Sequence, residues 1–586
     1  MKSKIIKKIC SIGLCFAMLL GVTACGDSAD DSTAVKGMIS AKPLTAAELG
    51  EGFNSDYLPD ASSIKQLSGK VDVCLDFEGT QPGWQALAKE YQRLHSNAVV
   101  VNINTNFAGS QYAERLNKEL PNKSTDWDIV EGNLGYSNVR PNCIDMYSSI
   151  QSTNPYAGKN VKWNTVLDRA AYRTKEADNS GESYILNTEV MQTCWFVNDV
   201  ALREAAELGY KNARGKAEYP ITWDDLISLC DYMQQAGYTN PLGITLCNAS
   251  IESLQFTWLL RVYGDYYYRQ FYKYVMAADD AETPDVWDNY DPTASVVENL
   301  HGYGFQWAKM LNILFNENTT LKCGYQGFKS ELYMDFVGQL AKMNGYLMKD
   351  AVYTEFGALR DQFATQSGGK GSPQILLDYQ GFGITYEKDE SATFELGYFD
   401  YPQMITGRYT SGDKKDEYFV DPVTKTRDIG GNGGFLSVVK HGGAQDELNR
   451  DFIKFVMSPY GQTIYYKGLA EADAVPKGLS TVNHDLVVIP SEWTSFFNEC
   501  NKTITFSGDV DANHFLSWGV RYVCGLPATS AVIHELWRNL LGVTGTNITV
   551  NAFAAYWNTA VYTDTKEQLT INRWPESVLT DPNVKL

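Results

Sequence analysis

The alternation of hydrophobic and polar residues predicts a parallel sheet at the start of the folded region. Strands are expected at residues 71–76, 98–103 and 126–130, with helices at 83–95 and 111–120 between them. The first of these helices carries its apolar residues on one face, at spacings of three and four: Trp84, Leu87, Ala88, Tyr91 and Leu94. A strand–helix–strand order of this kind is typical of a parallel sheet covered by helices.

A second α/β unit follows, with strands expected at 191–197 and 241–246 on either side of a helix. Thr222 is expected to cap that helix, and the carboxylate of Asp225 three residues later completes the cap. The tryptophans of this unit fit the strand and helix patterns and are expected in the core: Trp195 and Trp223.

The rest of the chain continues the α/β pattern. Strands are expected at residues 374–378, 394–401 and 430–440, the last one entered through a glycine-rich turn. A helix at 446–458 is expected to stop at Pro459, because proline lacks the amide N–H that would continue a helix. The tyrosine-rich region 251–347 is expected to be mostly helical, and further helices are expected in the C-terminal part.

The N-terminus resembles a bacterial lipoprotein signal. Four lysines in the first eight residues precede an apolar run at 9–24, which is shorter than a typical membrane span. The sequence Val22-Thr-Ala-Cys25 resembles a lipobox, which implies cleavage before Cys25 and lipidation of that residue. The resemblance predicts a signal peptide at 1–24, then a lipidated cysteine and a flexible tether at 25–66, with one short helix around 45–49.

Length and charge narrow the class of protein. A chain of 586 residues indicates more than one domain. The formal net charge of −20 disfavours nucleic acid and anionic membrane surfaces as partners. The 36 tyrosines can supply half-exposed surfaces that bind polar ligands, although a large core explains an aromatic content of 13% equally well.

The sequence contains no motif that indicates catalysis, a cofactor or a metal. Residues 368–372 are glycine-rich but lack P-loop spacing, and no Gly-x-Ser-x-Gly occurs. Eight cysteines remain beyond Cys25; they show no zinc-ligand spacing, and buried thiols are expected. We therefore expect no metal, no cofactor and no catalytic residue, although a pair of carboxylates for glycoside cleavage stays open.

The order of the segments resembles the extracellular solute-binding proteins of bacterial ABC importers, family 1, the branch that mostly binds carbohydrates. The resemblance rests on the lipobox and on the order of several short segments, among them Trp195-Phe-Val-Asn-Asp199, Tyr219-Pro-Ile-Thr-Trp-Asp-Asp-Leu226 and Ala474-Val-Pro-Lys477. It implies two α/β lobes with a ligand cleft and a hinge between them. By this resemblance the first lobe comprises 67–183 and 436–480, and the second comprises 187–434 and 485–586.

The resemblance also places the hinges near 184–187 and 434–435, and it assigns ligand contacts to the loops after the strands. In the first lobe these contacts are Glu78, Asn106, Phe107, Glu131 and Asn133. In the second lobe they are Tyr379, Phe382 and Tyr401, with Trp258 and Trp518 as candidate stacking platforms. Aromatic rings stack on the apolar faces of sugars, while carboxylates and amides bind the hydroxyl groups.

The implied function is capture of a carbohydrate, most simply an oligosaccharide, by a monomer on the outer face of the bacterial membrane. The lipid at Cys25 would hold the protein there, and an ABC permease would receive the ligand. Other hypotheses stay open: a peptide or an acidic sugar as ligand, a surface enzyme that degrades glycosides, or an adhesive lipoprotein without a small ligand. Several arginines in the cleft would favour an acidic sugar, and aromatic residues with amides a neutral one.

Overall fold

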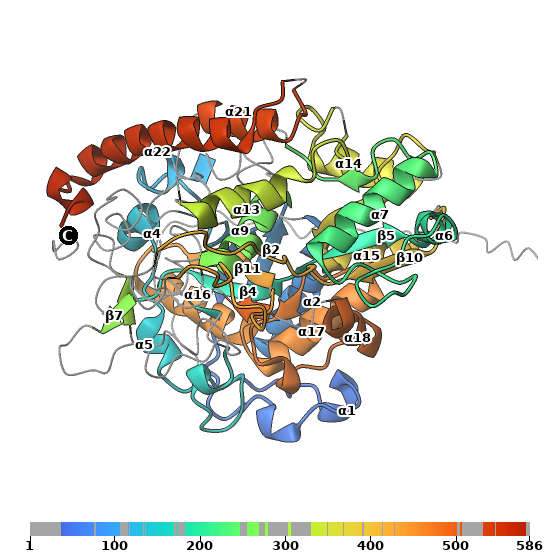
Figure 1. The fold of residues 1–586 in the computed structure, drawn as a ribbon. Coiled ribbons are helices and arrows are strands. Elements are labelled where there is room, and N and C mark those ends of the chain that lie inside the picture. The colour runs from blue at the N-terminus through green and yellow to red at the C-terminus, as the bar shows by residue number, and fades with distance from the viewer. Residues whose placement is uncertain are drawn as a thin grey trace, which may run out of the picture.

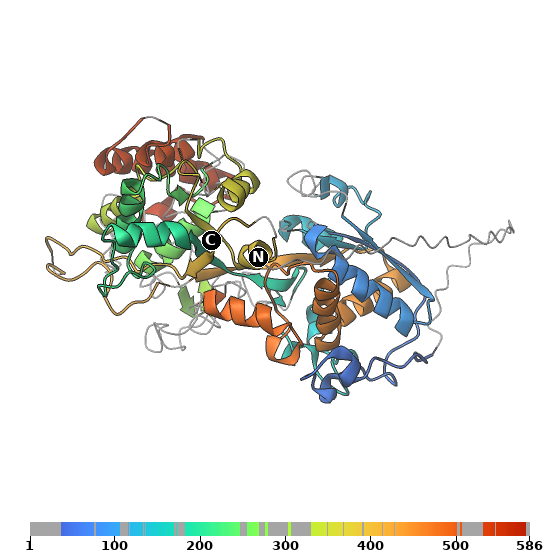
Figure 2. The ribbon, with the colours of Figure 1, turned by 90° about the vertical axis from the view of Figure 1, so that its right-hand side faces the viewer.

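The computed structural model shows two α/β lobes that are joined by strands crossing between them (Figure 2). The structure describes residues 37–75, 78–105, 115–116, 118–132, 134, 136–168, 171–172, 182–246, 255–268, 276–278, 303–305, 330–348, 350–366, 369–389, 392–412, 414–426, 428–500, 504–506, 531–544 and 546–581.

The first lobe is built on a mixed sheet with the strand order β12-β4-β11-β3-β1-β2. Its strands are β1 (Gly69–Cys74), β2 (Val99–Asn104), β3 (Ile129–Glu131), β4 (Leu186–Met191), β11 (Asp428–Val438) and β12 (Leu479–Ser480), and β13 (Ile504–Phe506) pairs with β11. β1 runs parallel to β2 and β3, whereas β11 is antiparallel to β3 and β4. The three strands predicted for the parallel unit are therefore confirmed.

Helix α2 (Gln81–Leu94) packs on β2 and against α17 (Pro459–Glu471). The two helices approach closely because Gly468 faces Ala86: a Cβ atom at Gly468 would lie 2.5 Å from the Cβ of Ala86. α16 (Gly443–Val456) ends before Pro459 as predicted, and Ser458 then caps α17 by accepting the N–H of Gly461 at 3.0 Å. The smaller elements of this lobe are α1 (Ala46–Leu49), α4 (Tyr136–Asn142), α5 (Tyr147–Ile150), η1 (Ser55–Tyr57), η2 (Glu78–Thr80), η3 (Trp163–Thr165) and η8 (His484–Leu486).

The second lobe has a four-stranded sheet with the order β10-β5-β9-β6. Its strands are β5 (Thr193–Asn198), β6 (Leu242–Gly243), β9 (Ile375–Tyr379) and β10 (Leu396–Phe399). The helices around it are α6 (Asp199–Glu207), α7 (Trp223–Gln235), α9 (Gln255–Tyr268), α13 (Glu331–Ala341), α14 (Phe356–Gln366), α15 (Gln380–Lys388), α18 (Ser491–Cys500), α21 (Ala531–Leu540) and α22 (Val550–Asn572). α21 and α22 run along the top of the molecule in Figure 1, where α22 packs on α13, and η10 (Glu576–Leu579) follows.

Local predictions for the second lobe hold. The Thr222 hydroxyl accepts the N–H of Asp225 at 3.2 Å, and the Asp225 carboxylate accepts the N–H of Thr222 at 2.9 Å, so the capping box is confirmed. Trp195 and Trp223 are fully buried, as expected. The region 251–347 differs in part, because β7 (Met276–Ala278) and β8 (Tyr303–Phe305) form an antiparallel pair between helices α9 and α13.

The chain passes between the lobes at Gln192, which connects β4 of the first sheet directly to β5 of the second. β4 is paired with β11 and with β12, so its backbone hydrogen bonds hold it in the first sheet as far as Met191. The change of sheet therefore lies beyond the predicted hinge at 184–187. At the other predicted hinge, Gly434 has φ +59° and a Cβ atom there would collide with the hydroxyl of Thr188, so this position requires glycine.

Residues 37–66 are not a flexible tether, which corrects the prediction for that part of 25–66. The segment buries isolated apolar side chains and is tied to the first lobe by polar contacts. The Tyr460 hydroxyl accepts the N–H of Leu44 at 2.9 Å, and Lys467 donates to the carbonyl of Glu48 at 2.9 Å. The short predicted helix is confirmed as α1.

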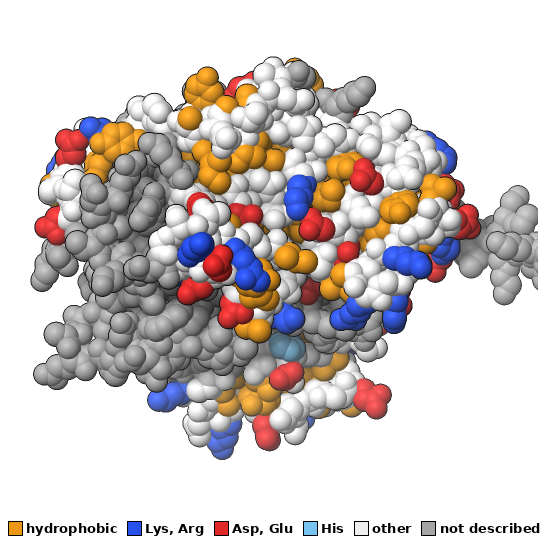
Figure 3. Space-filling view, viewed as in Figure 1, with side chains coloured by type: hydrophobic (Ala, Val, Ile, Leu, Met, Phe, Trp, Pro, Cys, Tyr) orange, Lys and Arg blue, Asp and Glu red, His pale blue; other side chains and the backbone are white. Residues whose placement is uncertain are grey.

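The described surface carries charges of both signs, and the described cysteines are buried. Basic and acidic side chains are interspersed on the described part of the face in Figure 3. Cys143 and Cys230 are buried free thiols, as predicted, and burial raises the pKa of the Cys143 thiol to about 12. Within the described ranges, every helix is too short or too polar to cross a bilayer.

Candidate functional site

The C-terminal end of β3 carries Glu131, one of the predicted ligand contacts. Its side chain is 4% exposed, and Lys477 lies against it with an Nζ–Oε1 distance of 3.3 Å. Lys477 belongs to the segment that leads from α17 to β12. The ion pair therefore joins this segment to the end of β3. Glu131 is therefore not a solvent-exposed carboxylate in a loop. It is buried and forms an ion pair with Lys477.

A second buried carboxylate belongs to the same cluster. Glu189 on β4 is 2% exposed, and the hydroxyl of Tyr465 donates to its Oε1 at 2.6 Å. Burial raises the pKa of Glu189, and the nearby Glu131 carboxylate adds to this, while Lys477 and the hydrogen bond from Tyr465 oppose it. The Lys477 ammonium group thus pairs with Glu131 and also favours the charged form of Glu189.

The second lobe meets this cluster through the first turn of α15. A Cβ atom at Gly381 would lie 2.9 Å from the carbonyl oxygen of Pro476, so the helix lies directly against the segment that carries Lys477. The N–H of Gln380 also donates to the carbonyl of Gln192 at 3.0 Å. The end of β9 in the second lobe and the end of β3 in the first lobe therefore both lie close to the point where the chain crosses between the lobes.

Three aromatic rings gather where β9 ends. The ring centroids of Trp258 and Tyr379 are 4.5 Å apart, and Phe356 stands edge-on to both, at 6.0 Å from Trp258 and 6.2 Å from Tyr379. All three side chains are only partly buried. They come from the starts of α9 and α14 and the end of β9, so three separate elements build one aromatic surface. Trp258 and Tyr379 are two of the predicted ligand contacts, and their contact with a ligand stays a prediction.

Arg360 lies beneath this surface and is already bound by a carboxylate. Its guanidinium donates two hydrogen bonds of 2.5 Å to Asp378, which is fully buried, and it stacks 4.1 Å from the centre of the Phe356 ring. The pair is neutral as a unit and fixes the position of Phe356. Because Asp378 occupies the guanidinium, this arginine supports the aromatic rings and does not present its charge to a ligand.

Two of the predicted contacts in the second lobe are packed into the protein. Tyr401 is 5% exposed, its hydroxyl lies 2.6 Å from that of Thr193, and its ring packs on Trp195, so it is a core residue and the prediction of a ligand contact is wrong. Phe382 is half-buried and packs edge-on against Phe196 at 5.3 Å. Phe382 therefore contributes more to the wall behind the aromatic surface than to the surface itself.

The remaining predicted site residues lie where the structure does not describe their side chains. Asn106, Phe107, Asn133, Trp518 and Cys25 lie outside the described residues, and so does the side chain of Glu78. They stay predictions. Phe356, Arg360 and Lys477 were not predicted; Lys477 stood in the Ala474–Lys477 segment of the resemblance, whereas Phe356 and Arg360 carried no local signal.

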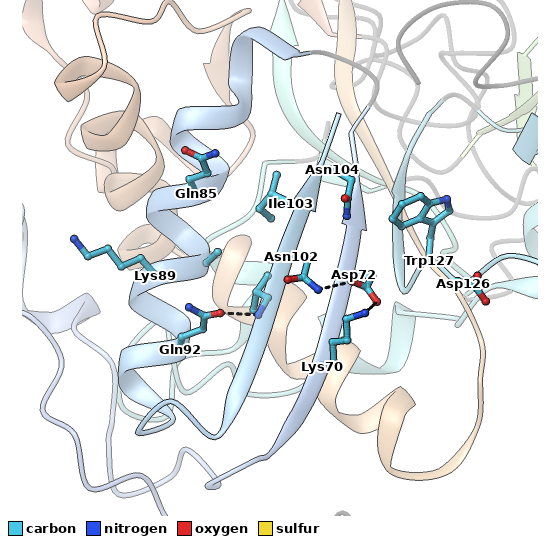
Figure 4. A pocket seen from close by; sticks show the side chains of 12 residues that line it. Lys70, Asp72, Gln85, Lys89, Gln92, Asn102, Ile103, Asn104, Asp126 and Trp127 are labelled. Carbon is cyan, nitrogen blue, oxygen red and sulfur yellow. Dashed lines mark hydrogen bonds and ion pairs between the residues drawn. The ribbon is translucent and has the colours of Figure 1, made fainter. Parts of the chain in front are cut away.

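A separate groove of about 700 Å³ runs along the open edge of the first sheet (Figure 4). Its floor is β2 with the adjoining part of β1, one wall is α2, and Asp126 and Trp127 stand on the other side. Its far end is Asn104, two residues before the predicted contact Asn106. The described part of the chain holds no cluster of three or more His, Cys, Asp or Glu side chains suited to a metal ion.

Comparison with known proteins identifies the fold. No protein-family model and no curated protein matches the sequence. Among solved structures, the chain is similar to the cyclic alpha-maltosyl-1,6-maltose binding protein from Arthrobacter globiformis, with a TM-score of 0.50 and 13% identity, over 85% of this chain and 100% of that one. It is also similar to a family 1 extracellular solute-binding protein from Bifidobacterium longum subsp. infantis, with a TM-score of 0.45 and 14% identity, over 85% and 99% of the two chains. The first likeness confirms the predicted two-lobe α/β fold.

Proposed function

We propose that this protein is the substrate-binding component of an ABC importer, and that it captures a neutral carbohydrate between its two lobes. The observation that carries the proposal is the aromatic surface of Trp258, Phe356 and Tyr379 at the strand ends of the second lobe, next to the crossing strands. A sugar has apolar C–H faces that stack on such rings and hydroxyl groups that bind carboxylates and amides. The two-lobe fold, which the Arthrobacter protein shares, supports this role.

Closure of the lobes is the proposed mechanism. The second lobe rotates about Gln192 and about the part of β11 that precedes its pairing with β4, and the bound sugar holds the closed form together. A ligand can favour one form only as far as it binds that form more tightly, so contacts from both lobes are required. Lys477 and Glu131 stand on the first-lobe side of the crossing, and the aromatic surface stands on the other.

A neutral sugar fits the site better than an acidic one. Arg360 stacks on Phe356 in the aromatic surface, and two of its N–H groups donate to Asp378. Lys477 is likewise paired with Glu131. A sugar carboxylate would have to displace one of these partners, whereas a hydroxyl group can join either pair without breaking it.

Delivery and anchoring complete the proposal. The lipid at Cys25 holds the protein on the outer face of the membrane, and the closed form presents its ligand to the permease. The fixed segment 37–66 then leaves residues 26–36 as the connection between the lipid and the folded protein. The buried state of Glu131 and Glu189 disfavours an enzymatic role for this pair, since a general acid or base must reach its substrate.

Thermal unfolding with a panel of neutral oligosaccharides tests the proposal. A ligand that binds only the folded form, present at a hundredfold excess over its Kd, stabilises it by about 2.7 kcal/mol. We expect at least one sugar to raise the Tm, and we expect a smaller rise at the same sugar concentration when Trp258 is replaced by alanine. Turnover of any sugar during the incubation, or a Tm that no sugar moves, would exclude the proposed function.

A further inference from the structure

The groove along β2 carries ligand-binding chemistry of its own, apart from the crossing strands. Four carboxamides line it: Gln85, Gln92, Asn102 and Asn104. Trp127 stands at its side with a partly exposed ring (Figure 4). Its volume of about 700 Å³ lies within the range of small-molecule sites, roughly 300–1,000 Å³.

The charges in the groove balance. Lys70 pairs with Asp72 at 2.7 Å, and the remaining pair of opposite charges, Lys89 and Asp126, comes from the two walls. Asn102 uses its Nδ2 to donate to Asp72 at 2.7 Å, and its oxygen is directed away from Asp72 in Figure 4. The lining therefore offers donors and acceptors together without a net charge, which suits hydroxyl groups better than an ion.

The backbone edge of β2 is protected against another strand. The carbonyls of Ala98 and Asn104 accept the N–H groups of Gly69 and Leu75, so alternate residues of β2 face β1 and the N–H of Val101 faces the open edge. Gln92 accepts the N–H of Val101 at 2.7 Å. A strand that added to this edge would have to displace the Gln92 side chain. Proteins commonly protect the edge strands of their sheets against such pairing. The carboxamide keeps its own N–H groups for a ligand in the groove.

We propose that this groove is a second saccharide-binding site, which takes a neutral oligosaccharide lying along β2 with one sugar ring against Trp127. β2 has six residues, which at about 3.3 Å per residue gives a floor long enough for more than one sugar unit. The site is distinct from the interlobe site, and its failure would leave the proposed function untouched. It would let the first lobe hold a long glycan from outside the lobes.

Fluorine NMR of protein labelled with 5-fluorotryptophan tests this site directly. The Trp127 resonance is assigned with Trp127→Phe, and the protein is titrated with maltotetraose, xylotetraose, mannotetraose and chitotetraose. We expect at least one of them to shift the Trp127 resonance. The double variant Gln85→Ala/Asn102→Ala should weaken that binding at least tenfold, whereas Gln151→Ala, an exposed carboxamide elsewhere on the first lobe, should leave it unchanged.

Trp258→Ala separates the two sites. We expect it to leave the Trp127 titration unchanged while it weakens interlobe binding about tenfold or more. The proposal is overturned if none of the four sugars shifts Trp127, if the double variant binds as the wild type does, or if Trp258→Ala removes the Trp127 response. Tighter binding at Trp127 by an extended hexapeptide of alternating threonine and valine would also overturn it, in favour of strand addition.

Discussion

Replacing Lys477 by methionine is expected to destabilise the protein strongly at pH 8 and much less at pH 5. The substitution leaves Glu131 without its ion-pair partner and removes a nearby positive charge from Glu189; the two residues are 4% and 2% exposed. Removing one partner of a buried ion pair costs about 3–5 kcal/mol, and the partial exposure of Lys477, 19%, places the expected loss near 3 kcal/mol.

The dependence on pH follows from Glu189. Burial raises the pKa of Glu189 in the folded protein, and the loss of Lys477 removes a group that opposes this rise. A carboxyl group with a raised folded pKa destabilises the fold above that pKa, and the penalty disappears as the pH falls toward the unfolded value of about 4.3. Lowering the pH therefore reduces the destabilisation by Glu189 more in the variant than in the wild type.

Urea unfolding followed by tryptophan fluorescence at the two pH values measures this difference. Lys70→Met is the matched control, because Lys70 pairs with Asp72 on the surface and is 61% exposed; its loss should be below about 0.5 kcal/mol. Lys477→Met/Glu131→Gln should recover part of the stability. An equal loss at pH 5 and pH 8, or a loss no larger than that of Lys70→Met, would refute the buried-cluster reasoning.

Three further predictions concern the site and two titrating groups. Trp258→Ala should weaken binding of a neutral oligosaccharide about tenfold or more by calorimetry, since the lost stacking area is worth about 1.5–2 kcal/mol, and Trp258→Phe should retain most of the affinity. Asp168→Asn should stabilise the protein at pH 8 and not at pH 4, because burial raises the pKa of Asp168 to about 6 and its charged form therefore opposes folding above that pH. His441→Gln should cost about 1 kcal/mol at pH 5.5 and little at pH 9, because the hydrogen bond to Asp128 raises the pKa of His441 and this stabilisation is lost as the pH rises through that value. Urea midpoints across this pH range check both titrating groups, and a shift of the opposite sign in either would contradict its assignment.

The elements that the sequence predicted well are those defined by local pattern. Thr222 and Asp225 lie three residues apart, so their reciprocal cap could be identified without the rest of the fold. The same holds for Trp195 and Trp223, whose periodicity placed them in the core. Tyr379 was expected just after a strand and lies at the end of β9, but its contact with Trp258 of α9 was not predicted.

The errors arose where the partner is distant in sequence. Tyr401 follows a strand in the same way as Tyr379, but Thr193 and Trp195 on the neighbouring strand enclose it, and its own segment does not reveal this. Residues 37–66 show only weak periodicity in the sequence, yet Ile39, Leu49, Phe53 and Ile64 are buried in the folded protein. Phe356 and Arg360 join the site because Asp378, on another element, holds Arg360 in place.

The distance between the lobes, measured with and without ligand, tests the central claim most directly. Spin labels at positions 151 and 216 place one probe on an exposed site of each lobe, and pulsed electron paramagnetic resonance gives the distribution of distances. We expect a neutral oligosaccharide that raises the Tm to shorten and narrow this distribution as well, and we expect Trp258→Ala to require at least tenfold more sugar for the same change. A sugar whose binding depends on Trp258 and leaves the distribution unaltered would contradict capture by closure between the lobes.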